Sequence, residues 1–104
     1  MDVYKVNITE PAENDLRDIA RYISFQLLAP ATALNMMKTI RREISKLGTN
    51  AFIHPLVKDE RLAVMGYRLL VIKNYIAFYI VNEAEKTIDV DRVLYGRRDW
   101  QQLL

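Results

Sequence analysis

Hydrophobic and polar positions alternate one by one over residues 3–8, where Tyr4, Val6 and Ile8 share one side of an extended chain. A period of two predicts a first strand. From Thr9 the apolar residues instead recur every three or four positions, which is the period of a helix with one buried face. The pattern therefore changes from strand to helix at Thr9, and either Thr9 or Glu10 can cap the helix.

Two helices are predicted between residues 9 and 48, because Pro11 suits a first helical turn and Pro30 interrupts the pattern and opens a second helix. Gly48 stands at the position after the second helix that often takes a left-handed conformation. The short link predicts an antiparallel helical hairpin. The apolar stripes consist of Ala12, Leu16, Ile19, Ala20, Ile23 and Leu27 in the first helix and Ala33, Leu34, Met37, Ile40, Ile44 and Leu47 in the second.

The second half of the chain reads as strands. Residues 48–65 are expected to form a loop with at most one helical turn, and residues 67–72 and 75–81 to form a β-hairpin that turns at Lys73-Asn74. Residues 87–95 form a last strand, with Ile88, Val90 and Leu94 expected on one face. The order β-α-α-β-β-β predicts an α+β fold, a single domain over residues 1–104 in which an antiparallel four-stranded sheet packs on the helical hairpin.

Composition narrows the function classes. The chain has 104 residues, 51% of them apolar, and a net charge of +2, which is too weak to indicate nucleic-acid binding by itself. It has no cysteine, and its one histidine, His54, cannot build a metal site alone, so we expect no metal and no cofactor. The N-terminus lacks a signal-peptide pattern, and the longest apolar run, residues 75–81, is too short to cross a bilayer. We therefore expect a cytoplasmic protein without a membrane partner.

The C-terminal stretch carries the clearest candidate binding residues, Arg97, Arg98 and Trp100. The planar guanidinium fork suits phosphates and carboxylates. These residues therefore suggest contact with nucleic acid, a phosphate-rich enzyme or an acidic protein. The structural alternative is an arginine pair bound to its own sheet, with Trp100 closing the core.

Three motifs in this order resemble the RelE/ParE superfamily of bacterial toxins from type II toxin–antitoxin modules. They are AENDLRDI over residues 12–19 with Tyr22-Ile23, GYRLLV and NYIAFY over residues 66–71 and 74–79, and RVLYGRR over residues 92–98. The resemblance covers nearly the whole chain and implies a growth-arresting, plasmid-stabilising toxin held inactive by a cognate antitoxin in a hetero-oligomer. It also implies one of two targets: the ribosome with its mRNA, or DNA gyrase.

RelE-like members cut mRNA, which requires groups that take a proton from the ribose 2′-OH and stabilise the charged phosphorane. By resemblance, Arg68 and Arg98 match two of the expected basic positions. Leu70 and Ile76 stand where a lysine and an arginine are expected, and the expected tyrosine would lie beyond Leu104. Aliphatic side chains cannot transfer protons, so the resemblance names no secure catalytic residue. If the chain is a ribonuclease, Arg68 and Arg98 carry the reaction.

ParE-like members block gyrase without cutting nucleic acid, and this chain resembles them more closely. Their hairpin likewise has an aliphatic residue after Asn-Tyr, as at Ile76, and an arginine pair near the end of the last strand. A non-toxic structural or binding module of the same fold remains a third interpretation. The residues expected to bind the target or the antitoxin are Arg68, Tyr75, Arg97, Arg98 and Trp100. For Arg68, an ion pair with Asp89 or Asp91 is the structural alternative.

Overall fold

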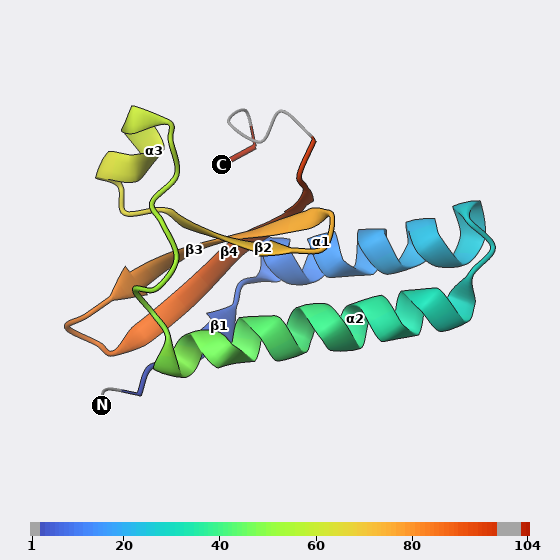
Figure 1. The fold of residues 1–104 in the computed structure, drawn as a ribbon, viewed down its shortest axis with the longest axis horizontal. Helices are drawn as coiled ribbons and strands as arrows, with labels where there is room; N and C mark the ends of the chain where they lie inside the picture. Colours follow the sequence, from blue (N-terminus) through green and yellow to red (C-terminus); the bar gives the residue numbers. More distant parts are fainter. Residues whose placement is uncertain (1–2, 98–102) are drawn as a thin grey trace.

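The computed structural model describes residues 3–97 and 103–104, and it contains one four-stranded sheet in the order β1-β4-β3-β2 (Figure 1). The elements in chain order are β1 (Lys5–Ile8), α1 (Glu10–Arg21), a π-helical turn (Tyr22–Gln26), α2 (Pro30–Ser45), a 3-10 turn (Lys46–Thr49), α3 (Glu60–Val64), β2 (Arg68–Ile72), β3 (Tyr75–Asn82) and β4 (Thr87–Tyr95). The α+β class and the element order are confirmed, and α3 is the single helical turn expected in the loop. No helix among the described residues is long and apolar enough to cross a membrane.

The expectation of a purely antiparallel sheet is wrong for β1. Strands β2, β3 and β4 are antiparallel to one another, but β1 pairs in parallel with β4, with Val6 opposite Ile88 and Ile8 opposite Val90. Tight turns force neighbouring strands to run antiparallel, whereas β1 reaches the sheet through a helical crossover. The sheet is therefore mixed.

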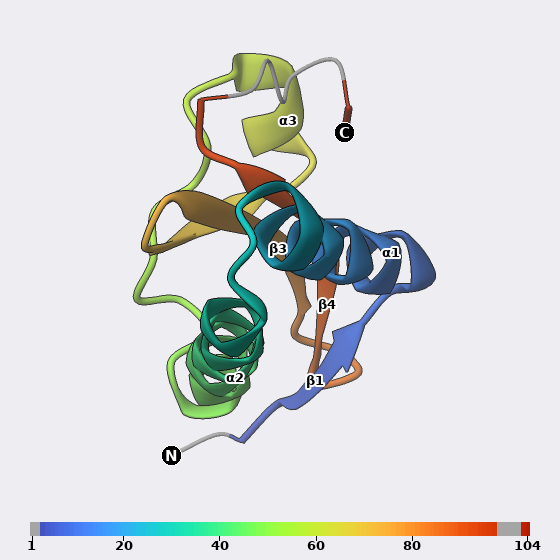
Figure 2. The ribbon, with the colours of Figure 1, turned by 90° about the vertical axis from the view of Figure 1, so that its right-hand side faces the viewer.

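The two long helices form the predicted hairpin, and Figure 2 shows them nearly end-on beside the sheet. The Thr9 hydroxyl accepts a hydrogen bond from the Ala12 N–H at 3.3 Å, so Thr9 is the cap and Glu10, the other candidate, is the first residue of the helix. Beyond Arg21 the helix widens into the π-helical turn, and the Leu27 N–H donates to the Tyr22 carbonyl. The connection then passes through Leu28, whose φ of 53° is unusual for a branched side chain.

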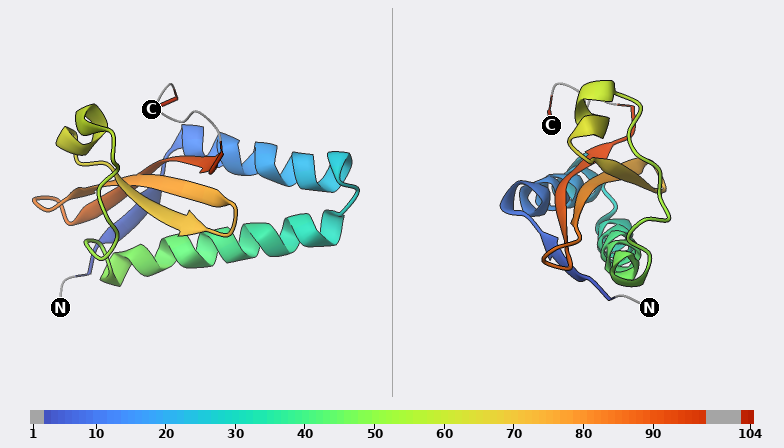
Figure 3. Two further views of the ribbon diagram at one scale, coloured as in Figure 1. Left: turned by 45° about the horizontal axis from the view of Figure 1, so that its top comes forward. Right: turned by 90° about the vertical axis from the view of Figure 1, so that its left-hand side faces the viewer.

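Apolar residues cover both faces of the sheet. One cluster lies between the sheet and the helical hairpin and includes Leu16, Ile40, Tyr79 and Val90. A smaller cluster on the opposite face brings Leu62 of α3 together with sheet residues, and Leu103 and Leu104 pack against it. Figure 3 shows α3 and the end of the chain on the opposite side of the sheet from α2. The second face is therefore partly covered and is not an open surface.

A register shift in the β3–β4 pair changes the direction of side chains in the last strand. Phe78 lies opposite Arg92 and Tyr79 opposite Val90, which leaves Asp91 as the extra residue of a bulge. As a result, Val90 and Val93 both join the helix-side cluster, and Leu94 joins the cluster on the other face. The prediction that Leu94 shares a face with Val90 is wrong, because a strict period of two cannot anticipate a bulge.

Gly48 has a different role from the predicted one. It lies within the 3-10 turn that follows α2, and its carbonyl accepts the Tyr4 N–H at 2.8 Å. A Cβ at this position would lie 3.1 Å from the Tyr4 carbonyl oxygen. The glycine therefore permits a close approach of two backbones, while the positive φ of 93° belongs to Gly66.

Candidate functional site

A groove of about 560 Å³ lies between α1 and the adjoining ends of β3 and β4, and we call it the α1 groove. Its floor and walls are mostly apolar or aromatic, and among the described residues its only charged side chains are Asp15 and Asp18. Its volume falls in the range of about 300–1,000 Å³ that is typical of binding pockets. The lining residues are Asp15, Asp18, Ile19, Tyr22, Leu27, Asn74, Tyr75, Val93, Leu94 and Tyr95.

Tyr75, a predicted binding residue, lies in this groove. It is half-buried at the start of β3, opposite Tyr95, and the two rings meet edge to face with centroids 6.0 Å apart. Burial raises the pKa of the Tyr75 hydroxyl, and Tyr22 and Tyr95 add to this shift. Tyr75 is therefore protonated at neutral pH and can donate a hydrogen bond to a partner, but it cannot act as a general base there.

A smaller hollow of about 200 Å³ adjoins the groove at the β2–β3 turn, and we call it the turn hollow. Two exposed basic side chains, Lys73 and Arg97, line it together with Val71 and Ile76. The Gly96 N–H donates to the Asn74 carbonyl at 2.8 Å, which fixes the end of β4 against the turn. Tyr75 and Arg97 both line the turn hollow. The α1 groove and the turn hollow together form one site, and its positive end is the turn hollow.

The opposite end of the α1 groove opens onto an unusually apolar helix connection. Tyr22 and Leu27 line the groove, and the neighbouring Phe25 and Leu28 are 73% and 82% exposed. Clustered exposed apolar side chains of this kind commonly mark a protein interface. The site is thus apolar at the helix connection and basic at the β2–β3 turn.

Arg68 lies apart from Tyr75, because the two occupy opposite ends of the β2–β3 hairpin. Its guanidinium donates to the His54 carbonyl at 2.7 Å and lies over the Phe52 ring, 5.1 Å from the centroid. The carboxylates considered as its partners are bound elsewhere: Asp91 accepts from Tyr67 and Asp89 from Asn7. The alternative of an Arg68–aspartate pair is therefore wrong.

The two aliphatic residues at expected ribonuclease positions lie on opposite faces of the sheet. Leu70 is buried in the helix-side cluster, and Ile76 packs against the other cluster and lines the turn hollow. Within residues 3–97 and 103–104, no three His, Cys, Asp or Glu side chains are close enough to hold a metal ion. Arg98 and Trp100 lie outside the described residues.

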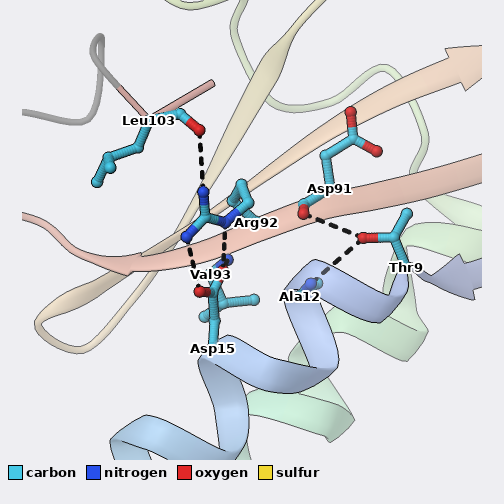
Figure 4. A network of polar contacts seen from close by, with 7 residues as sticks. All are labelled: Thr9, Ala12, Asp15, Asp91, Arg92, Val93 and Leu103. Carbon is cyan, nitrogen blue, oxygen red and sulfur yellow. Dashed lines mark hydrogen bonds and ion pairs between the residues drawn. The ribbon is translucent and has the colours of Figure 1, made fainter.

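One buried polar network was not predicted from the sequence, and Figure 4 shows it in detail. The Asp15 carboxylate on α1 accepts two hydrogen bonds from Arg92, at 2.7 and 2.9 Å, and a third from the Val93 N–H at 3.0 Å. Arg92 also donates to the Leu103 carbonyl at 2.9 Å. The hydrogen bond to Asp15 and the charge of that carboxylate raise the pKa of Arg92.

A signal for this network was present in the sequence. Asp15 stands three residues after Ala12 and four before Ile19, which places it on the border of the apolar stripe rather than on the outer face. The network fixes α1 against β4 and therefore sets the walls of the α1 groove, of which Asp15 and Val93 are part.

Comparisons with known proteins agree with this geometry. The family model described as "ParE toxin of type II toxin-antitoxin system, parDE" matches residues 6–100. A chain of the chromosomal ParDE toxin–antitoxin system from P. aeruginosa superimposes with a TM-score of 0.74 at 23% identity, covering 89% of this chain and 96% of that one. A chain of the RelBE2 toxin–antitoxin complex from Mycobacterium tuberculosis gives a TM-score of 0.62 at 16% identity, with 89% and 98% covered. No curated protein sequence matches the chain.

Proposed function

The chain belongs to the ParE toxin family of type II toxin–antitoxin systems, and we propose from this premise that it arrests growth by binding DNA gyrase, without cutting RNA. A cognate antitoxin neutralises it in a toxin–antitoxin hetero-oligomer. Its site of action is the cytoplasm, where gyrase and DNA are located. The observation that carries the proposal is the α1 groove with the adjoining turn hollow, because the apolar lining of the groove and the basic side chains of the hollow suit a protein partner.

The composition of the groove supports protein binding over acid–base chemistry. Side chains from α1, β3 and β4 supply aromatic and aliphatic contact area, and its tyrosine Tyr75 has a raised pKa. Protein interfaces are enriched in aromatic residues and arginine, which together describe Tyr75, Tyr95 and Arg97. Cleavage of RNA would instead need a proton acceptor and phosphate-binding cations on one surface. At two of the positions where the resemblance places basic residues, this chain has the aliphatic Leu70 and Ile76, and these lie on opposite faces of the sheet.

The antitoxin is proposed as a partner with a net negative charge. The two structural relatives described above are both toxin–antitoxin systems. The chain carries a net charge of +2, and Lys73 and Arg97 are exposed beside an apolar surface. An antitoxin segment with apolar side chains and carboxylates complements this surface.

A RelE-like ribonuclease is the second candidate, and Arg68 is the observation that favours it. Among the described residues its guanidinium contacts the His54 carbonyl and the Phe52 ring, and no carboxylate there neutralises its positive charge. Such a guanidinium can hold a phosphate. Under this candidate Arg68 and Arg98 would contact mRNA.

Induction of the chain without antitoxin tests the two candidates together. The gyrase proposal predicts filamentation, DNA double-strand breaks and a DNA-damage response while bulk mRNA stays intact. Cuts at fixed codon positions in ribosome-bound mRNA, lost on Arg68→Ala, would establish the ribonuclease instead. Unchanged growth with the protein present in soluble form would contradict both.

A further inference from the structure

Within residues 3–97 and 103–104, the outer edge of β2 is only half covered. Strand β2 is the last strand of the sheet, and residues 55–57 run antiparallel along its first half. The Leu69 N–H donates to the Pro55 carbonyl at 3.1 Å, and the Val57 N–H donates to the Tyr67 carbonyl at 3.0 Å. The outward-facing backbone groups therefore belong to the odd-numbered residues.

The same alternation directs the backbone groups of Val71 outward. Leu70 and Ile72 pair with Ala77 and Tyr75 of β3, so Val71 between them presents its N–H and carbonyl to the open side. The covering segment turns away before reaching it, since the Ile53 N–H bonds back to Asn50. The Val71 side chain is 62% exposed. An apolar strand edge whose backbone N–H and carbonyl groups are unpaired is a template for another strand.

Hollows flank this edge on both faces of the sheet. The turn hollow lies on the side of Val71 and Ile76. A second hollow of about 230 Å³, lined by Glu43, Lys46, Asn50, Ile53, His54 and Leu70, lies on the helix side. Successive side chains of an added strand point to opposite faces of the sheet, so both hollows would receive one. Figure 2 shows the β2–β3 hairpin projecting from the molecule.

We propose that the edge of β2 around Val71 accepts an extended segment of the antitoxin, which places apolar side chains in the two hollows and a carboxylate beside Lys73 and Arg97. This inference rests on the proposed function, because it takes the antitoxin as the occupant. The charges favour an acidic segment over a second copy of this chain, whose own edge carries the same two basic residues.

Hydrogen exchange and binding of the full chain test the proposal, with the purified protein encoded beside this chain's gene as the probe. The complex should slow exchange of the Val71 amide at least tenfold. Val71→Pro removes that N–H at an edge position where proline is tolerated, and it should weaken binding at least tenfold. The double variant Lys73→Glu/Arg97→Glu should weaken binding similarly, and Lys58→Glu, an exposed charge elsewhere, should not.

Val71→Lys tests the edge if the proline variant fails to fold, since it places a charge on the edge and leaves the backbone intact. Its matched control is Val64→Lys on α3, where the valine is 88% exposed. A complex in which Val71 exchanges freely and Val71→Lys binds like the wild type overturns this inference and leaves the proposed function standing. The absence of any complex with the neighbouring gene product overturns this inference together with the proposed antitoxin partner.

Discussion

Asp15 and Arg92 form a bidentate ion pair across 77 positions of sequence, with Nε–Oδ2 and Nη2–Oδ1 distances of 2.7 and 2.9 Å. The pair joins α1 to β4 beside the bulge at Asp91. Because Asp15 and the neighbouring Val93 line the α1 groove, the ion pair links the stability of the fold to the shape of the proposed binding surface.

Asp15→Ala should lower the free energy of unfolding by about 3 kcal/mol, because it leaves the Arg92 guanidinium and the Val93 N–H without their acceptor. Urea denaturation at neutral pH measures this loss. Asp18→Ala on the same helix is the control: its side chain is 75% exposed and lies 3.8 Å from Arg21. We expect a change below about 0.5 kcal/mol there. Equal losses in the two variants would refute the structural role of the ion pair.

Two buried tyrosines should make the fold sensitive to alkaline pH. Burial raises the pKa of both Tyr67 and Tyr79 from 10.0 to about 12, and Asp91 adds to the shift of Tyr67. The folded state favours the neutral phenol, so this stabilisation is complete below pH 10 and is lost as the pH rises toward 12.

Urea denaturation from pH 8 to about 12 measures this dependence. Tyr67→Phe should lower stability at pH 8 by about 1–2 kcal/mol, through the lost hydrogen bond to Asp91. It should also make the alkaline decline shallower. Tyr22→Phe changes a half-exposed ring and should leave the decline as steep as in the wild type. A Tyr67→Phe curve parallel to the wild-type curve would contradict the assignment.

The elements with local causes could be predicted from the sequence. The cap at Thr9, the break at Pro30 and the turn at Lys73-Asn74 depend on a few neighbouring residues, and all three are where the pattern placed them. The parallel pairing of β1 depends on a long crossover, and the bulge at Asp91 on the fit of two strands. Neither leaves a periodic trace in the sequence.

The site was predictable only in part for the same reason. Resemblance pointed to Tyr75 and Arg97, which do lie at one site, but it grouped them with Arg68 at the far end of the hairpin. The groove itself depends on how α1 lies over β4. That arrangement depends on the ion pair between Asp15 and Arg92. No short motif reveals this pair, because the two residues are far apart in the sequence.

Leu27→Asp should impair neutralisation by the antitoxin, because it places a charge in the apolar end of the α1 groove. The side chain is 56% exposed, so folding should be retained. We expect at least tenfold weaker binding of the neighbouring gene product, measured by isothermal titration calorimetry. Val64→Asp on α3 is the matched control and should bind normally. Wild-type affinity in Leu27→Asp would exclude the groove as part of the antitoxin interface.

The most direct measurement of the central claim is a supercoiling assay with purified gyrase, ATP, relaxed plasmid DNA and increasing amounts of this chain. We expect dose-dependent loss of supercoiling with accumulation of gyrase-cleaved DNA, both reversed by the antitoxin. Full supercoiling at a large molar excess of folded protein, together with codon-positioned cuts in ribosome-bound mRNA, would contradict the claim.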